Sequence, residues 1–280
     1  MWKTKLCLGI GSQFGEDLEA QLALFCRTGF EGFFVDWTPD RDLARLRARA
    51  DELGMLFQSV HAPFGKAARM WMEGECAQEA VDELLRCLED CAANGVPLVV
   101  CHCFIGFDDH TPTSAGIVNY GKVVDRAQQL GLRIAFENTE GEEYLQALME
   151  AFDNRPHVGF CWDTGHELCY NRGKDMTALY GDRLFGTHLN DNLGIKAHDG
   201  TITWLDDLHL LPFDGITDWQ NVADRLCRCG FDGPLTFELT VLSKPDRHEN
   251  DVYAQMGLEQ YVAEAYKRAC RVAALVHKSR

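Results

Sequence analysis

Short apolar runs recur along the chain, separated by segments in which apolar residues repeat every three or four positions. The first pattern predicts β-strands and the second predicts amphipathic helices. We expect eight strands, over residues 5–10, 32–37, 56–64, 98–104, 133–139, 158–163, 184–191 and 234–240. Helical periodicity is clearest in four segments that each end at a glycine, a common residue at helix C-termini. These helices are expected over residues 43–53, 76–94, 117–130 and 219–229.

Strands that alternate with helices are typical of parallel βαβ units and therefore of an α/β protein. Eight such units in 280 residues fit a closed (β/α)8 or TIM barrel, a fold that usually takes about 250 residues. A doubly wound open sheet is the alternative fold. Because the sequence contains no low-complexity linker, we expect residues 1–280 to form a single (β/α)8 barrel domain.

Charge and composition narrow the classes of partner. The chain has 27 Lys and Arg against 43 Asp and Glu, a formal charge of −16, which disfavours nucleic acid as a partner. No apolar run approaches the length of a membrane span, so no membrane partner is expected. The start of the chain lacks the pattern of a signal peptide, and its 12 cysteines include no CxxC pair. Reduced thiols and a cytoplasmic location are therefore expected.

Most of the expected strands end in a side chain suited to metal binding or acid–base chemistry. In a parallel barrel the C-terminal ends of the strands converge on one face, where active sites lie. We therefore expect one site at that face rather than six separate buried polar groups. The strand-end residues are His61, His102, Glu137, Asp163, His188 and Glu238.

Alternation along each strand supports this convergence, because successive side chains point to opposite faces. If Glu137 points into the barrel, its bulky neighbour Phe136 points outward to the helices. With His102 inward, Cys101 and Cys103 point outward, which excludes a Cys-His-Cys metal site. The other strand-end candidates face inward by the same rule.

Two Glu, one Asp and one His form a mixed nitrogen and oxygen ligand set. Such a set suits Mn²⁺, Mg²⁺, Co²⁺, Fe²⁺ or Zn²⁺. The alternative is that each charged group pairs with a buried Arg or Lys, but the only basic strand residues are Lys5 and Arg133, at the opposite ends of their strands. For His61 or His102 taken alone, a hydrogen-bonded barrel histidine is an equal alternative to a ligand.

A long loop is expected at residues 192–216, on the same face as the strand ends. Long loops inside compact domains are often functional. We also consider Lys66, Lys196 and Trp204 as covers for the site, although ordinary loop residues are the favoured interpretation of these three. The loop carries five further polar candidates, His198, Asp199, Asp206, Asp207 and His209.

At these strand-end motifs the chain resembles the xylose isomerase-like TIM barrel superfamily. This superfamily includes sugar phosphate isomerases and epimerases, dehydratases and endonuclease IV. The resemblance implies substrate-binding roles for His61, His102 and His166, the last being the histidine of an Asp-x-x-His motif. It also implies one divalent ion held by Glu137, Asp163, His188 and Glu238. An endonuclease IV-like set would add His61, His102, His166, Asp207 and His209 as further ligands of zinc.

What the resemblance implies chemically is a metal-dependent isomerase or epimerase of a small sugar, sugar phosphate or related polyhydroxy carbonyl compound. Glu137 and Glu238 would be its catalytic acid and base, removing a proton to give a metal-stabilised enediolate. The ketose 3-epimerases carry an Arg shortly after the metal-binding His, where this chain has Gly194. Dehydratase or lyase activity on a similar substrate, an abasic-site endonuclease with several zinc ions, and a binding barrel without turnover remain alternatives. A small sugar or polyol is the expected partner, and a homo-oligomer stays open.

Overall fold

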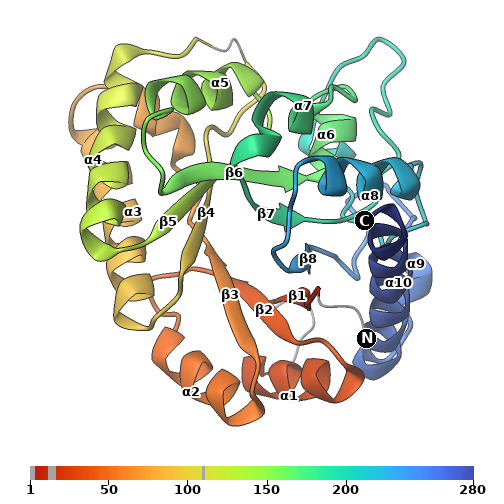
Figure 1. Ribbon diagram of the computed structural model, residues 1–280. Helices are drawn as coiled ribbons and strands as arrows, with labels where there is room; N and C mark the ends of the chain where they lie inside the picture. The colour runs from red at the N-terminus through yellow and green to blue at the C-terminus, as the bar shows by residue number, and fades with distance from the viewer. Residues whose placement is uncertain (1–3, 12–16, 109–110) are drawn as a thin grey trace.

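Eight parallel strands form a nearly closed barrel with the helices outside it (Figure 1). The computed structural model describes residues 4–11, 17–108 and 111–280. The strand order is β7-β6-β5-β4-β3-β2-β1-β8. A parallel bridge between Leu189 and Phe237 joins the two ends of this order, which confirms the predicted barrel over the open sheet. The strands are β1 (Leu6–Ile10), β2 (Gly32–Asp36), β3 (Leu56–His61), β4 (Leu98–His102), β5 (Arg133–Glu137), β6 (Val158–Asp163), β7 (Leu184–His188) and β8 (Leu235–Phe237).

The helices follow the strands in the expected alternation. α2 has the predicted bounds, because the Asp42 carboxylate caps its first turn and Gly54 ends it with a φ of 67°. The C-terminal helix α10, which the sequence analysis did not anticipate, packs against α8 and α1 (Figure 1). The α-helices are α1 (Leu18–Thr28), α2 (Leu43–Leu53), α3 (Glu75–Ala93), α4 (Ser114–Leu130), α5 (Glu142–Ala151), α6 (Thr164–Cys169), α7 (Met176–Tyr180), α8 (Trp219–Arg228), α9 (Asp251–Ala254) and α10 (Leu258–Ser279). Among the described residues, no helix is both long and apolar enough to cross a bilayer.

Apolar residues separate into a small barrel interior and a large outer core. Leu98, Val100, Ala135 and Cys161 form the interior cluster. Bulky neighbours such as Phe136 belong instead to the core between barrel and helices. This separation confirms the predicted alternation of inward and outward side chains.

The outer core also contains Cys101 and Cys103, as expected for side chains that flank an inward His102. Six strands end earlier than predicted: β2 at Asp36, β3 at His61, β4 at His102, β5 at Glu137, β7 at His188 and β8 at Phe237. Pro63 lacks an N–H, so the pairing of β3 with β4 stops after Ala62, whose N–H donates to the Val100 carbonyl at 2.8 Å. The basic residue Arg133 lies at the start of β5, with its guanidinium 5.1 Å from the centre of the Phe185 ring.

Candidate active site

Four ligand-type side chains meet at the C-terminal ends of the last four strands. Glu137, Asp163, His188 and Glu238 each offer one atom, and these four atoms lie within 4.8 Å of one another. The first three side chains are buried, whereas the Glu238 side chain keeps 24% of its surface exposed. Folding thus brings together the four residues predicted to hold a metal ion.

The spacing of these atoms fits a divalent cation. His188 Nδ1 lies 2.7 Å from Glu137 Oε1 and 3.0 Å from Glu238 Oε2. Adjacent ligands of an octahedral ion, each at about 2.1 Å from it, are separated by about 3.0 Å. Among the described residues, Glu137 Oε2 and His166 Nδ1 are buried without a hydrogen-bond partner, a costly state that an ion would relieve.

Neighbouring groups fix the orientation of Asp163. Its Oδ1 accepts a hydrogen bond from the backbone N–H of His166 at 2.6 Å, which caps the first turn of α6. The side-chain N–H of Asn190 donates to its Oδ2 at 2.8 Å. Asn138 holds the backbone, accepting from the Asp163 N–H at 2.8 Å and donating to the Asp163 carbonyl at 2.9 Å. Such outer contacts commonly orient metal ligands.

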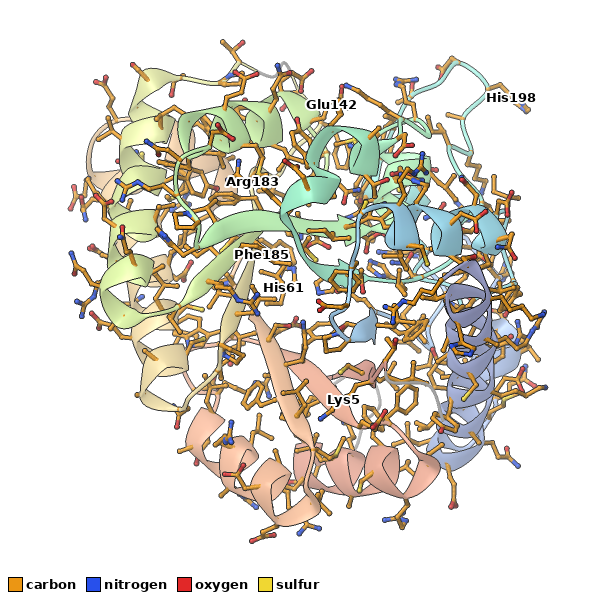
Figure 2. All side chains as sticks on the ribbon, in the orientation of Figure 1. Lys5, His61, Glu142, Arg183, Phe185 and His198 are labelled. Atoms are coloured by element: carbon orange, nitrogen blue, oxygen red, sulfur yellow. The ribbon has the colours of Figure 1, made fainter. Side chains whose placement is uncertain are left out.

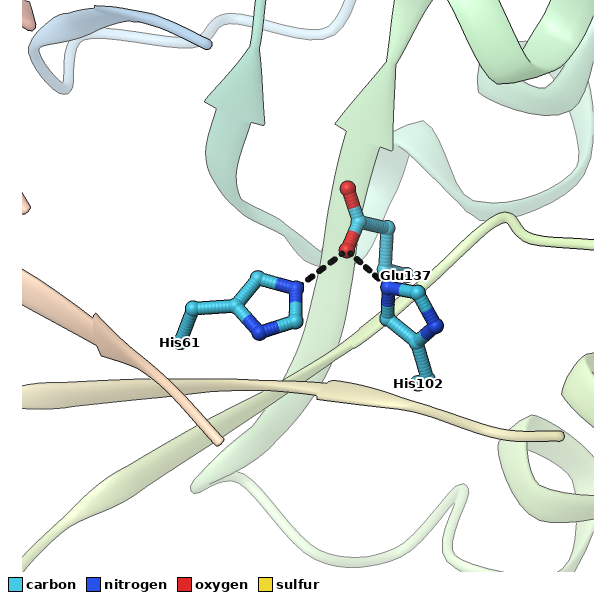
Figure 3. Close-up of side chains that lie close together, drawn as sticks. All are labelled: His61, His102 and Glu137. Carbon is cyan, nitrogen blue, oxygen red and sulfur yellow. Dashed lines mark ion pairs between the residues drawn. The ribbon is translucent and has the colours of Figure 1, made fainter. Parts of the chain in front are cut away.

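His61 and His102 both approach Glu137 from the ends of β3 and β4 (Figure 3). Their Nε2 atoms lie 3.3 and 3.5 Å from Glu137 Oε2, respectively. His61 Nδ1 lies 2.9 Å from the carbonyl of Ala62, which orients this ring. The structure therefore places both predicted histidines beside the ligand cluster.

The long loop adds a third group of ligand-type residues. His166 Nε2 lies 3.5 Å from Asp207 Oδ1, and His209 Nε2 lies 2.9 Å from Asp207 Oδ2. His209 Nδ1 is 4.0 Å from Glu238 Oε2, which connects this group to the first one. His209 also has a φ of 46°, uncommon for a residue other than glycine. His166, Asp207 and His209 thus lie beside the ligand cluster.

Other candidates from the same loop do not join it. His198 is exposed and lies far from His61 in Figure 2, on the outer bend of the loop. Asp199 is also exposed, and its carboxylate accepts the backbone N–H of Thr201. Asp206 accepts backbone N–H groups of Lys196 and Thr203, which is a local structural role.

Buried carboxylates and buried imidazoles shift each other's pKa in this cluster. Burial alone would raise the pKa of Glu137, but the neighbouring His188 holds it well below its usual range. Burial is likewise overcome at Glu238, where His188 and His209 lower the pKa to about 2. At Asp163 burial prevails and raises the pKa to about 6. Glu137 and Glu238 are therefore ionised at neutral pH, as metal ligands must be.

The pKa values of the buried imidazoles differ according to the charges beside each ring. Burial lowers the pKa of His102 to about 3, and the nearby His61 acts in the same direction. Burial also disfavours charge on His209, but Asp207 and Glu238 raise its pKa to about 9. His102 is thus a neutral ring, whereas His209 carries a proton in the metal-free protein.

A cavity of about 450 Å³ opens over the cluster. Of the three residues considered as covers, Trp204 lines it, whereas Lys66 pairs with Glu83 at 3.0 Å and Lys196 is exposed. Asp36 ends β2 and follows the same strand-end rule as the predicted ligands, so it could have been found. The lining residues that the sequence analysis missed include Asp36, Phe64, Glu140, Tyr170 and Lys244.

The fold agrees with a comparison of the chain against known protein families. The model described as "Xylose isomerase-like TIM barrel" matches residues 22–261. The chain therefore belongs to the xylose isomerase-like TIM barrel family.

The chain is also similar to individual proteins, in sequence or in fold. The protein is 27% identical to the uncharacterized protein y4fM of Sinorhizobium fredii, over 91% of this chain and 93% of that protein. It also resembles the solved structure of an IOLI protein with a binding zinc atom, with a TM-score of 0.72, 19% identity and 99% of both chains covered. L-ribulose 3-epimerase gives a TM-score of 0.73 at 15% identity, covering 99% of this chain and 96% of that one. The two structural similarities show that the fold is shared.

Proposed function

We propose that the protein is a divalent-metal-dependent isomerase or epimerase of a small sugar, sugar phosphate or related polyhydroxy carbonyl compound. One observation carries the proposal: Glu137 and Glu238 meet His188 at 2.7 and 3.0 Å, at the end of the barrel where the cavity opens. The similarity to a zinc-containing IOLI protein and to L-ribulose 3-epimerase supports it.

Glu137, Asp163, His188 and Glu238 would hold the ion, because their atoms are close enough to share one ligand sphere. When bound there, a divalent ion polarises a carbonyl group and makes the neighbouring C–H more acidic. The four proposed ligands supply one imidazole nitrogen and three carboxylate oxygens, a donor set that suits divalent ions without a thiolate. The proposed site is therefore a nitrogen and oxygen site.

The two glutamates differ in their access to substrate. Glu238 lines the cavity, so we assign it the removal of the proton next to the carbonyl, giving an enediolate. Glu137 is fully buried below it and is assigned the second acid–base role. Return of the proton to the neighbouring carbon gives isomerisation, and return to the same carbon from the other side gives epimerisation. His61, His102 and His166 line the cavity and would orient substrate oxygens.

Two other activities fit parts of the same site. A dehydratase or lyase would begin with the same proton removal and differ only in what leaves afterwards. An abasic-site endonuclease is favoured by one observation: ligand-type atoms of His166, Asp207 and His209 also lie within 4.8 Å of one another. Metal analysis separates the two classes, because three tightly held zinc ions support the nuclease and one exchangeable ion supports the isomerase.

Solvent deuterium exchange tests the proposal directly. The metal-loaded protein is incubated in D₂O with ketoses, aldoses, hydroxypyruvate and inososes, and deuterium at carbon is measured by mass spectrometry. We expect incorporation into at least one compound. Glu238→Gln should slow that incorporation by about 10²–10⁴-fold, the usual contribution of a general base.

The matched control is Glu52→Gln, at an exposed position at the end of α2, next to the start of β3 and therefore at the opposite end of the barrel. It should exchange deuterium at the wild-type rate. Metal content is measured for each variant, because Glu238 is also a proposed ligand. Wild-type exchange in Glu238→Gln at full metal occupancy would contradict the assigned role.

A further inference from the structure

A second cavity, of about 710 Å³, adjoins the one over the ligand cluster. Phe107, Glu140 and Tyr170 line both cavities, so the two share a wall rather than facing separate parts of the surface. Each volume falls in the range of pockets that bind complete small molecules. The combined space exceeds what one small sugar at the ligand cluster requires.

Aromatic rings connect the two cavities. The Tyr170 ring stacks on His166, with centroids 4.9 Å apart and an angle of 29° between the ring planes. Phe107 lies further along, 5.7 Å from Tyr170 between centroids. The rings of His166, Tyr170 and Phe107 thus form a row from the candidate metal cluster into the second cavity. Aromatic side chains bury large areas with little conformational freedom to lose, and they suit the C–H faces of a ring.

The polar groups of the second cavity favour a ligand with hydroxyl groups. Glu140, at the junction, is 7% exposed and accepts the backbone N–H of Gly106 at 2.9 Å. An ionised carboxylate has about four acceptor positions, and carboxylates bind sugar hydroxyls in other α/β proteins. Glu140 can therefore accept a ligand hydroxyl while it keeps its backbone partner.

The charges there disfavour an anionic ligand. Lys174 pairs with Glu142 at 2.6 Å, and Arg172 donates to the carbonyl of Gly200 at 3.1 Å. Both cations thus have partners within the chain, and the lining carries more acids than bases. Excess negative charge repels phosphate and carboxylate groups. The charged lining residues are Asp108, Glu140, Glu142, Glu143, Arg172 and Lys174.

We propose that the substrate is an uncharged sugar bearing a second polyhydroxylated unit, such as a glycosyl group, and that this unit occupies the second cavity. The inference rests on the proposed function, since the reacting carbonyl unit would lie over Glu137 and Glu238. Phe107, Glu140 and Tyr170 form the junction between the two units. This assignment narrows the substrate class and makes a phosphorylated sugar the disfavoured alternative.

Titration calorimetry with matched ketoses tests this inference. The Mn²⁺-loaded protein is titrated with fructose, with fructose 6-phosphate and with the glucosyl-fructoses turanose, maltulose, leucrose and isomaltulose. At least one disaccharide should bind about tenfold or more tighter than fructose, which corresponds to about 1.4 kcal/mol. Fructose 6-phosphate should bind no tighter than fructose.

Thr201→Trp then places a large ring in the second cavity, which the exposed Thr201 lines away from the ligand cluster. This variant should lose the disaccharide preference and keep the affinity for fructose. Gln129→Trp, at an exposed site on α4, is the control and should retain the preference.

The outcomes separate the two proposals. Equal affinity for fructose and every disaccharide, no binding of any sugar, or preference for the phosphate overturns the inference. Deuterium exchange, measured in parallel, reports on the proposed function by itself. Disaccharide preference without exchange from any compound would support the second cavity and overturn the assigned reaction.

Discussion

Asp163 shows how one carboxylate serves both the fold and the candidate site. It is the N-cap of α6, accepting the His166 N–H, and it also accepts the side chain of Asn190. Close packing makes the second contact feasible: a Cβ added at Gly165 would lie 1.9 Å from Asn190 Oδ1. Glycine at this position therefore lets Asn190 reach the carboxylate.

Replacing Asn190 should weaken metal binding without removing a ligand. Asn190→Ala deletes the 2.8 Å hydrogen bond that orients Asp163. Loss of such an outer contact typically lowers metal affinity by about 10–100-fold. The affinity is measured by competition for Mn²⁺ with a chromophoric chelator. Asn94→Ala, whose side chain only bonds the carbonyl of Asp90 on α3, should bind metal like the wild type. Wild-type affinity in Asn190→Ala would show that Asp163 needs no such support.

The predicted ligands were found from sequence because strand ends and alternation together fix where a side chain points. Glu137 and His188 each end a strand, as predicted, and their side chains point into the cluster. Glu140, Tyr170 and Lys244 were missed, since each lies beyond a strand and reaches the cavity only through the path of its loop. Hydrophobic periodicity carries no information about that path.

At the scale of elements, the buried carboxylate of Asp191 anchors the C-terminal end of the long loop. Asp191, just after β7, accepts the backbone N–H groups of Phe213 and Thr217 at 2.8 and 3.0 Å. It also accepts the Trp219 indole N–H at 2.9 Å, at the start of α8. Its backbone bridges to Leu210 next to His209. The side chain of Asp191 therefore holds the end of the loop, and its backbone holds the segment that carries Asp207 and His209.

Asp191→Ala should release the loop. The substitution leaves several buried N–H donors without a partner, so we expect the free energy of unfolding to fall by at least about 2 kcal/mol. Urea unfolding measures this loss, and limited proteolysis should show new cleavage within residues 192–216. Asp199→Ala, an exposed position of the same loop, should match the wild type in both assays. If the two variants unfold at the same urea concentration, the anchoring role of Asp191 is wrong.

This anchoring explains why the sequence analysis predicted the loop's function only in part. Its length and position indicated a role at the barrel face, and Asp207 and His209 do reach the site. His198 and Asp199 are equally polar, yet both are exposed. The difference comes from the tertiary contacts of Asp191, which a residue pattern does not reveal.

At the scale of the whole molecule, barrel architecture was the most predictable feature. The sequence contains eight apolar runs separated by helical segments. Few arrangements of eight such strands bury each of them on both faces, and the closed parallel barrel that the structure shows is one. The outer core then encloses Cys87, Cys101 and Cys103, and Cys7 on β1 is also fully buried. These thiols make the stability of the fold sensitive to alkaline pH.

Stability should decrease as pH rises above about 8.5, the ordinary pKa of a cysteine thiol. Burial raises the pKa of Cys7 to about 12, and it raises the pKa of Cys103 well above the usual value. Above that pH the unfolded chain loses thiol protons that the folded protein keeps, so unfolding becomes more favourable. The stabilisation is complete below the pKa that the thiol has in the unfolded chain. It is lost progressively as the pH rises toward the pKa of the thiol in the folded protein, by at most about 1.4 kcal/mol per pH unit for each thiol.

Urea unfolding at about pH 7.5, 8.5, 9.5 and 10.5 measures how steeply the free energy of unfolding falls with pH. Each buried thiol adds up to about 1.4 kcal/mol per pH unit to this slope. Cys7→Ala removes one buried thiol, so its free energy of unfolding should fall less steeply with pH than that of the wild type. Cys76→Ala is the matched control, because Cys76 is only half-buried at the start of α3 and should leave the slope unchanged. Comparing slopes cancels any pH-independent loss from the smaller side chain. Parallel curves for wild type and Cys7→Ala would contradict a thiol origin of the alkaline instability.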